Sequence, residues 1–415
     1  MVDDLLQYVF SSAASSQDQA IDIIKSGLGC QPDAESGPGS ARLHLGMAEV
    51  ERDRSNWAAA VDSAAAASKA ARAAEHESAE AVVASSQLEL AAYASGTLSY
   101  LTQGSDYEAL DLSQHALDIA HQSFHQHGAE QQRWAAMVEG NAMLCLVQHA
   151  RGDLNAASTS ADVAQALADH MDPGRASSGA HRDAAIPAAL QRVGALRLAM
   201  GNYEEATSLF NRAAAGVKHA LSADSARSAS MRAEPSPWAL RETLASACSG
   251  AGQASLGQKQ WEAAEEPLSE AVSEADRVTS EKHPRTVPLL VQLGVVFART
   301  SRVTIAEGLY RQAARMLQLD PAKGYAAAHP KVHPSVAAAL AWRYAQLLAA
   351  LPKRNTETEA WEGLAREIQS GENEEQSEHC LEEIYGELHS LQGKGMPGKG
   401  DICDVSTRRM LQYAP

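Results

Sequence analysis

The chain has 415 residues, of which 45% are hydrophobic but only 5% aromatic. Much of its apolar content is alanine, which has the highest helix propensity and lets backbones approach closely, so we predict an all-α protein of thin, tightly packed helices. The formal net charge of -17 repels phosphate backbones and argues against nucleic acid as a partner. No stretch approaches the roughly 20 uninterrupted apolar residues of a membrane span, so we expect no membrane insertion.

The amino-terminal residues 1–30 predict a short helical head. Apolar residues recur at helical spacing at Leu5, Leu6, Val9, Ile21, Ile24 and Leu28. Residues 31–40, QPDAESGPGS, have the composition of a linker. Asp3 and Asp4 stand where a secretory signal or a transit peptide would carry positive charge, and the five cysteines form no CxxC pair. We therefore expect an intracellular, reducing compartment, with the cytoplasm as the first choice and an organelle matrix as the second.

Two segments place small and large apolar residues in the same order. The first contains Leu190, Val193, Gly194, Gly201, Tyr203, Ala206, Phe210 and Ala213. The second contains Leu290, Leu293, Gly294, Phe297, Ser301, Ala306, Tyr310 and Ala313. In both, we expect the first glycine and the first alanine to be contact points between two helices, with the turn at Gly201 or Ser301.

Four weaker copies of this order carry an alanine at the corresponding place, at Ala60, Ala109, Ala157 and Ala264. A seventh, degenerate copy lies around Leu340, Ala360 and Leu364. The steps between successive alanines from Ala60 to Ala306 are 49, 48, 49, 58 and 42 residues. The first three steps are nearly equal, which indicates an internal repeat; an irregular alanine-rich bundle is the alternative interpretation.

This order of residues resembles the tetratricopeptide repeat, whose usual period is about 34 residues. The phrases EKHP before Thr286 and KVHP before Ser335 resemble the start of the first helix in the longer repeats of kinesin light chains. The resemblance implies a right-handed α-α superhelix of six to seven helix pairs over residues 41–368. The longer steps require lengthened helices or long links between them.

The remaining segments predict loops, a cap and a tail. Residues 171–185 and 222–237 are rich in Ser, Ala, Gly and Pro, which is typical of loops, and Ser236 with Pro237 predicts the cap and first turn of a helix that buries Trp238. Apolar residues at helical spacing predict a capping helix over residues 372–392. Residues 393–415 then predict a flexible tail.

The motifs that would indicate catalysis or a cofactor are missing from the sequence. It contains no GxSxG, no phosphate-binding loop, no HExxH and no GxGxxG that opens a helix after a strand, so we expect neither an enzyme nor a bound cofactor. His121 and His125 share a helical face at a spacing that could hold zinc, but no third ligand stands nearby and a solvated polar face is the better interpretation. We therefore assign no catalytic and no metal residues.

The expected work of such an array is to bind a segment of another protein. Stacked pairs form a concave wall from their first helices, and tetratricopeptide proteins bind extended or helical peptides there. Aligning the copies on their glycines places four candidate groove residues on this wall, and two more are further candidates: Gln191, Arg192, Gln292 and Arg299, then His149 and Trp342. An amide or a guanidinium among them could hold a ligand's main chain or carboxylates. Trp342 has a second interpretation, as core between repeats.

Charge suggests one kind of partner and argues against two others. Residues 357–389 contain eleven glutamates, whereas Arg366 is the one Lys or Arg in this run. Such a run forms either a solvated face or a docking surface for a basic segment. The lysine and asparagine pair with which some repeats capture chaperone tails is absent, since the best copies carry Gln191 with Ala195 and Val291 with Val295. The competing class is a pentatricopeptide-like RNA-binding protein, but that class needs a basic groove and a period near 35. We expect a protein scaffold, adaptor or assembly factor.

Overall fold

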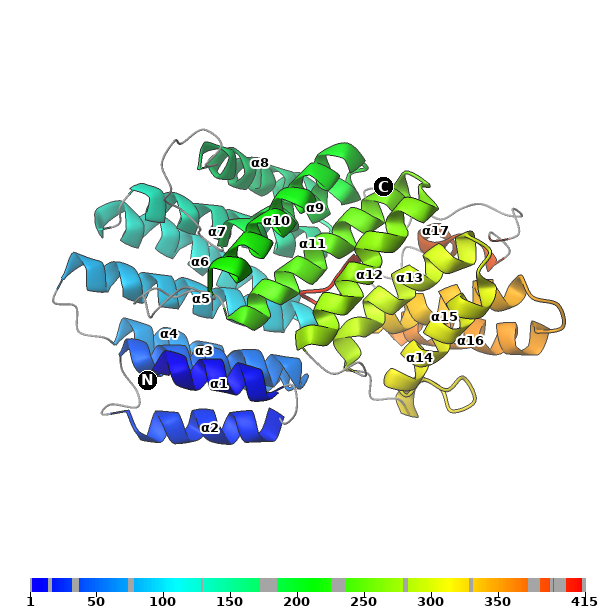
Figure 1. Ribbon diagram of the computed structural model, residues 1–415, viewed down its shortest axis with the longest axis horizontal. Coiled ribbons are helices and arrows are strands. Elements are labelled where there is room, and N and C mark those ends of the chain that lie inside the picture. Colours follow the sequence, from blue (N-terminus) through cyan, green and yellow to red (C-terminus); the bar gives the residue numbers. More distant parts are fainter. Residues whose placement is uncertain are drawn as a thin grey trace. The chain divides into compact units, whose positions relative to one another are not determined.

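The computed structural model describes residues 2–13, 17–31, 37–73, 78–127, 130–171, 185–224, 236–278, 283–327, 331–371, 381–388, 391 and 401–412. This part of the chain contains 17 α-helices, two short 3₁₀ helices and one two-stranded hairpin (Figure 1). The α-helices are α1 Val2–Ala13, α2 Gln17–Gly29, α3 Pro38–Asp53, α4 Trp57–Arg72, α5 Ala79–Gln103, α6 Asp106–His127, α7 Glu130–Ala150, α8 Leu154–His170, α9 Ala185–Ala199, α10 Tyr203–Asp224, α11 Pro237–Gly257, α12 Trp261–Val278, α13 Val287–Arg299, α14 Val303–Met316, α15 Pro334–Ala349, α16 Asn355–Gly371 and α17 Leu381–Tyr385. The 3₁₀ helices are η1 Pro284–Thr286 and η2 Tyr325–Ala327, and the strands are β1 Asp401–Asp404 and β2 Arg409–Gln412.

Seven consecutive helix pairs follow the seven copies of the sequence pattern, from α3 with α4 to α15 with α16. The second helix of each of the first six pairs has the predicted alanine in its second turn, and none of these alanines is exposed. They are Ala60, Ala109, Ala157, Ala206, Ala264 and Ala306. A buried alanine allows the two helices to lie close together without a cavity. The predicted fold class, an all-α array of tetratricopeptide-like helix pairs, is confirmed.

The turn within each pair contains one residue in the left-handed region, five positions before the buried alanine. These residues are Ser55, Gly104, Gly152, Gly201, Lys259, Ser301 and Lys353. In the seventh pair the fifth position after Lys353 is Thr358, which is buried and bonds its hydroxyl to the Arg354 carbonyl. The alanine of that degenerate copy is therefore replaced by Thr358, and Ala360 does not correspond to it.

Changing the turn glycine Gly201 to Ala should destabilise the protein by about 1 kcal/mol, because a side chain at its φ of 78° clashes with the backbone. The same change at Gly308 should instead stabilise by up to about 1 kcal/mol, since Gly308 lies inside α14 with no atom near its missing Cβ. Urea unfolding followed by circular dichroism measures both. If both variants changed the free energy of unfolding in the same direction, the assignment of Gly201 to a left-handed turn would be contradicted.

The long repeat steps arise from long helices as well as long links. The second pair combines 25 residues in α5 with 22 in α6, joined by the short turn at Gly104. The predicted loops at 171–185 and 222–237 fall mostly outside the described residues. Both explanations apply to the 58-residue step, since α10 has 22 residues, α11 has 21, and α11 begins only at Pro237 after α10 ends at Asp224.

The chain divides into two compact units. Unit 1 comprises Met1–Leu196 and Asn211–Leu244, and unit 2 comprises Arg197–Phe210 and Ala245–Pro415. In unit 1, α1 and α2 lie within residues 1–30, and both pack on α3. In both units the first helices of neighbouring pairs touch, as α3 touches α5 and α13 touches α15.

In unit 1, the start of α11 packs against α1 and α3. Ser236 caps this helix, since its Oγ accepts from the Ala239 N–H at 3.1 Å, and the Trp238 side chain is 7% exposed, as predicted. The Trp238 ring lies 5.3 Å from that of Phe10, centroid to centroid. Arg52 Nη2 lies 2.9 Å from Glu242 Oε2, with both side chains 8% exposed. The ring contact joins residues 228 apart in the sequence, and the ion pair joins residues 190 apart.

The carboxyl-terminal region differs from its prediction in two ways. In the predicted capping helix over 372–392, residues 372–380, 389–390 and 392 lie outside the described residues; the part that is described as helix is α17, which ends where Gly386 takes a φ of 83°. The prediction of a flexible tail over 393–415 is wrong for residues 401–412, which form the β1–β2 hairpin. Its strands are four residues each and lack a regular apolar alternation, so the sequence carries no clear strand signal.

Candidate functional site

Three of the six predicted groove residues lie in unit 1, and all three are buried. His149 on α7 is 4% exposed, while Gln191 and Arg192 on α9 are 6% and 8% exposed. Their polar atoms are therefore directed into the protein interior in this conformation. A role for them in partner binding stays a prediction.

The other three lie in unit 2 and differ in exposure. Gln292 on α13 is 4% exposed, and Trp342 on α15 is wholly buried, with its Nε1 donating to the Gly386 carbonyl at 2.9 Å. Arg299 is partly exposed, with its guanidinium carbon 5.5 Å from the Trp261 ring centroid. Burial and the charge of Arg343 lower the pKa of Arg299. Arg299 is thus the candidate with a side chain that solvent reaches.

The predicted repeat-packing residues are buried, apart from Tyr203, which is partly buried. They are Gly194, Tyr203, Ala206, Phe210, Ala213, Gly294, Ala306, Tyr310 and Ala313. Two contacts in unit 2 show how closely the helices approach. A Cβ on Gly294 would lie 2.4 Å from Tyr310 Cε1, and a Cβ on Gly257 would lie 2.3 Å from Tyr203 Cε1.

The hairpin in unit 2 identifies a wall that holds a polypeptide segment. The Gln253 side chain on α11 bonds to both main-chain groups of Cys403 in β1. Its Nε2 donates to the Cys403 carbonyl at 3.0 Å, and its Oε1 accepts from the Cys403 N–H at 2.6 Å. Gln253 is 2% exposed, and its Nε2 also donates to Ser249 Oγ at 2.9 Å, which fixes the amide. The pair of bonds is what a neighbouring strand would supply, and it does not depend on the side chain that is held.

The other strand is held at the start of α15. Ser335 Oγ accepts from the Met410 N–H at 3.1 Å, and the His333 N–H donates to the Arg408 carbonyl at 3.3 Å. In addition, β1 contacts α13 and β2 contacts α15. The helices α11, α13 and α15 are each the first of a pair, and first helices are the ones from which helical repeats build their concave wall. We call this surface the hairpin wall, meaning Gln253, α13, and His333 with Ser335.

The turn of the hairpin is organised by Asp404. Its carboxylate accepts from the Ser406 N–H and from the hydroxyls of Ser406 and Thr407, the last at 2.7 Å. Arg408 closes the turn with a φ of 51°. Apolar side chains of the hairpin are buried, with Ile402 at 1%, Val405 at 0% and Leu411 at 3% exposure.

Acidification should weaken the docking of the hairpin, because His333 takes up a proton more readily when the hairpin is undocked. Burial and the charge of Arg409 lower the pKa of His333 well below its usual 6.5, so the docked state keeps it neutral. With the hairpin undocked, His333 would take up a proton as pH falls below 6.5, which favours the undocked state; above that pH both states are neutral and nothing changes. Between pH 7 and pH 5.5 we expect about a tenfold loss of protection, corrected for intrinsic exchange, in hydrogen exchange of the 401–412 amides. The variant His333→Asn, which can still cap α15, should lose less than twofold; an equal loss would contradict the role of His333.

Gln253, His333 and Ser335 were not predicted from the sequence to contact a bound segment. Gln253 directly follows Gly252, at the position where the two best copies have Ala195 and Val295. A glutamine at a position that is apolar in both of the best copies was a usable signal. His283 and His333 lie in the EKHP and KVHP phrases, and the Nδ1 of each accepts from the N–H two residues later at 3.2 Å and so caps the following helix.

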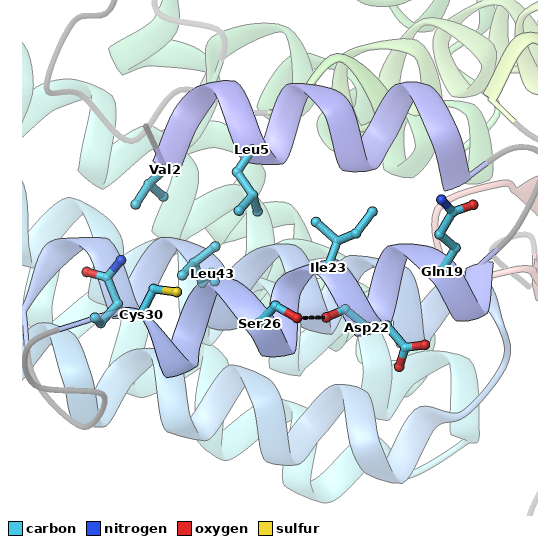
Figure 2. A pocket seen from close by; sticks show the side chains of 10 residues that line it. Val2, Leu5, Gln19, Asp22, Ile23, Ser26, Cys30 and Leu43 are labelled. Carbon is cyan, nitrogen blue, oxygen red and sulfur yellow. Dashed lines mark hydrogen bonds between the residues drawn. The ribbon is translucent and has the colours of Figure 1, made fainter.

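Unit 1 contains a cavity of about 350 Å³ between α1, α2 and α3 (Figure 2). Val2, Leu5, Ile23 and Leu43 supply apolar walls, and Cys30 is among the polar lining residues. Ser26 Oγ, also in the lining, donates to the Asp22 carbonyl at 2.8 Å. Such a lining suits a small apolar group.

The remaining predicted chemistry concerns metals and acidic residues. Among the described residues, no three His, Cys, Asp or Glu side chains come together as metal ligands would. His121 is exposed, and the side chain of His125 lies outside the described residues. In the acidic run, Arg366 pairs with Glu362 at 3.0 Å and with Glu382, while residues 372–380 are not described.

In the described part of the chain, no helix has the length and apolar character needed to cross a membrane.

Comparisons with known proteins give structural neighbours of low sequence identity. No protein-family model and no curated protein matches the chain. The structure of BtubC (BKLC) from P. vanneervenii is 15% identical, with 64% of this chain and 91% of that chain covered and a TM-score of 0.45. The apo form of RapI is 13% identical, with coverage of 76% and 97% and a TM-score of 0.43. A Rap protein complexed with competence and sporulation factor is also 13% identical, with coverage of 85% and 84% and a TM-score of 0.44.

Proposed function

We propose that this protein is a non-enzymatic binding scaffold that holds an extended or helical segment of a partner protein on the hairpin wall of unit 2. The observation that carries the proposal is the pair of hydrogen bonds between the Gln253 amide and the main chain of Cys403. Bonds to main-chain groups give affinity for any extended segment, while neighbouring side-chain pockets give specificity. The surface can therefore hold a polypeptide in a β-like conformation.

The chemistry of the wall favours a polypeptide over RNA. Its contacts with the hairpin come from an amide, a hydroxyl and a main-chain N–H, and the net charge of the whole chain is -17. RNA-binding repeats rely on basic grooves and on side chains that read single bases. Retention of single-stranded RNA on a filter at low salt would favour the competing class instead.

A photo-cross-linking experiment tests the proposed function. A benzophenone amino acid replaces Ser335, which contacts the hairpin, or Ile305, which is 48% exposed on the second helix α14. After irradiation of the full chain in its cells of origin, mass spectrometry identifies the cross-linked segments. We expect segments of other proteins at position 335 in several-fold excess over position 305. Equal recovery at both positions would contradict the proposal.

A further inference from the structure

The hairpin wall is occupied by the protein's own chain. Gln253 and Cys403 are 150 residues apart, and Ser335 and Met410 are 75 residues apart, so their contacts are tertiary. An isolated two-stranded hairpin is at best marginally stable in water, so residues 401–412 depend on the wall for their order. The hairpin thus behaves as a ligand that is tethered to its own receptor.

A partner that used the same contacts would compete with the hairpin. Gln253 can form only one such pair of main-chain bonds at a time, and Ser335 Oγ accepts from Met410 in the docked state. A tether of this kind gives the hairpin an effective concentration in the millimolar range when its length allows docking. Partner affinity is then reduced by the fraction of molecules whose wall is open.

We infer that residues 401–412 are an autoinhibitory internal ligand, which a partner segment must displace from the hairpin wall. The inference rests on the proposed function. The competing partner is an extended polypeptide that presents a main-chain N–H and carbonyl to Gln253 and an apolar side chain in place of Ile402. Ile402 is 1% exposed, so the partner's side chain would be enclosed in the same way.

A peptide supplied in trans tests the inference directly. The probe is a fluorescein-labelled synthetic peptide of residues 400–413, titrated into the full chain and followed by anisotropy. The variant I402D with L411D places charges where the docked hairpin is buried and leaves the wall intact. It should bind the probe at least tenfold more tightly than the unmodified chain does. Adding Gln253→Leu to this double variant should weaken its binding of the probe about tenfold. As a control, Ile305→Asp in the unmodified chain introduces a charge like that of I402D, but on an exposed part of α14, and should leave the weak binding of the probe unchanged.

Hydrogen exchange of the unmodified chain gives a second test that needs no variant. We expect the amides of residues 401–412 to exchange at least tenfold faster than the α13 and α15 amides, because the hairpin opens without those helices. Exchange of the hairpin amides and the helix amides at one common rate would overturn the inference. Equal binding of the probe to the unmodified chain and to the I402D, L411D variant would overturn it as well.

The two proposals fail in distinguishable ways. Segments of other proteins cross-linked at Ser335, together with a hairpin that exchanges only with α13 and α15, would overturn the inference and support the proposed function. Suppose that the I402D, L411D variant binds the probe tightly, but that cross-linked segments of other proteins are recovered equally at positions 335 and 305. This result would support the internal ligand and contradict the partner-binding function.

Discussion

Replacing Gly294 by Ala should destabilise unit 2 by about 3 kcal/mol, which is at the upper end of what overpacking costs. The new Cβ would lie 2.4 Å from Cε1 and 2.8 Å from Cζ of Tyr310. The Tyr310 side chain is 1% exposed, so its ring has no free space to move into. Hydrogen exchange of the α13 and α14 amides should become roughly 100-fold faster, since 1.4 kcal/mol corresponds to a factor of ten in opening.

A double variant separates the clash from a general effect of alanine in α13. Tyr310→Leu alone removes a ring that lies 5.8 Å from Tyr344, centroid to centroid, and should itself cost stability. When Gly294→Ala is added to Tyr310→Leu, however, the further loss should fall below about 1 kcal/mol because the ring is gone. Additive losses would contradict the assigned contact between these two residues.

The sequence determines the helix pairs well because the contacts that define them are local. Ala206 and Ala306 each follow their turn by five residues, and Gly294, which contacts Tyr310 of α14, lies in the preceding helix α13. The turns are harder to predict from the sequence, because Lys259 and Lys353 take a left-handed conformation that lysine does not indicate. Glycine marks this position in only three of the seven pairs.

The occupied wall could not be predicted in the same way. Its contacts join Gln253 to Cys403 and Ser335 to Met410, and no periodic pattern connects these positions. The groove prediction also assumed that polar residues on first helices face solvent. Gln191 and Gln292 are instead buried, because glycine and alanine bring the helices close enough to enclose even polar side chains.

The largest loss in unit 1 should come from Glu242→Leu, at about 3–5 kcal/mol. Arg52 and Glu242 are 2.9 Å apart with both side chains 8% exposed. Arg52 Nε and Nη1 are buried without a hydrogen-bond partner in the described part of the chain, so removal of the carboxylate leaves its charge uncompensated. Thermal unfolding of the full chain should show an earlier transition. Exchange of the α3 amides should accelerate at least 100-fold, since about 3 kcal/mol corresponds to that factor.

The double variant Arg52→Met with Glu242→Leu should recover most of this loss. Two apolar side chains of similar length remove both the charge and the cost of burying it, and such replacements are often neutral or stabilising. Recovery would show that packing holds the start of α11 on α1 and α3, including the contact of Trp238 with Phe10 of α1, and that the ion pair fixes which residues meet. A double variant as unstable as Glu242→Leu alone would instead make the ion pair itself the source of stability.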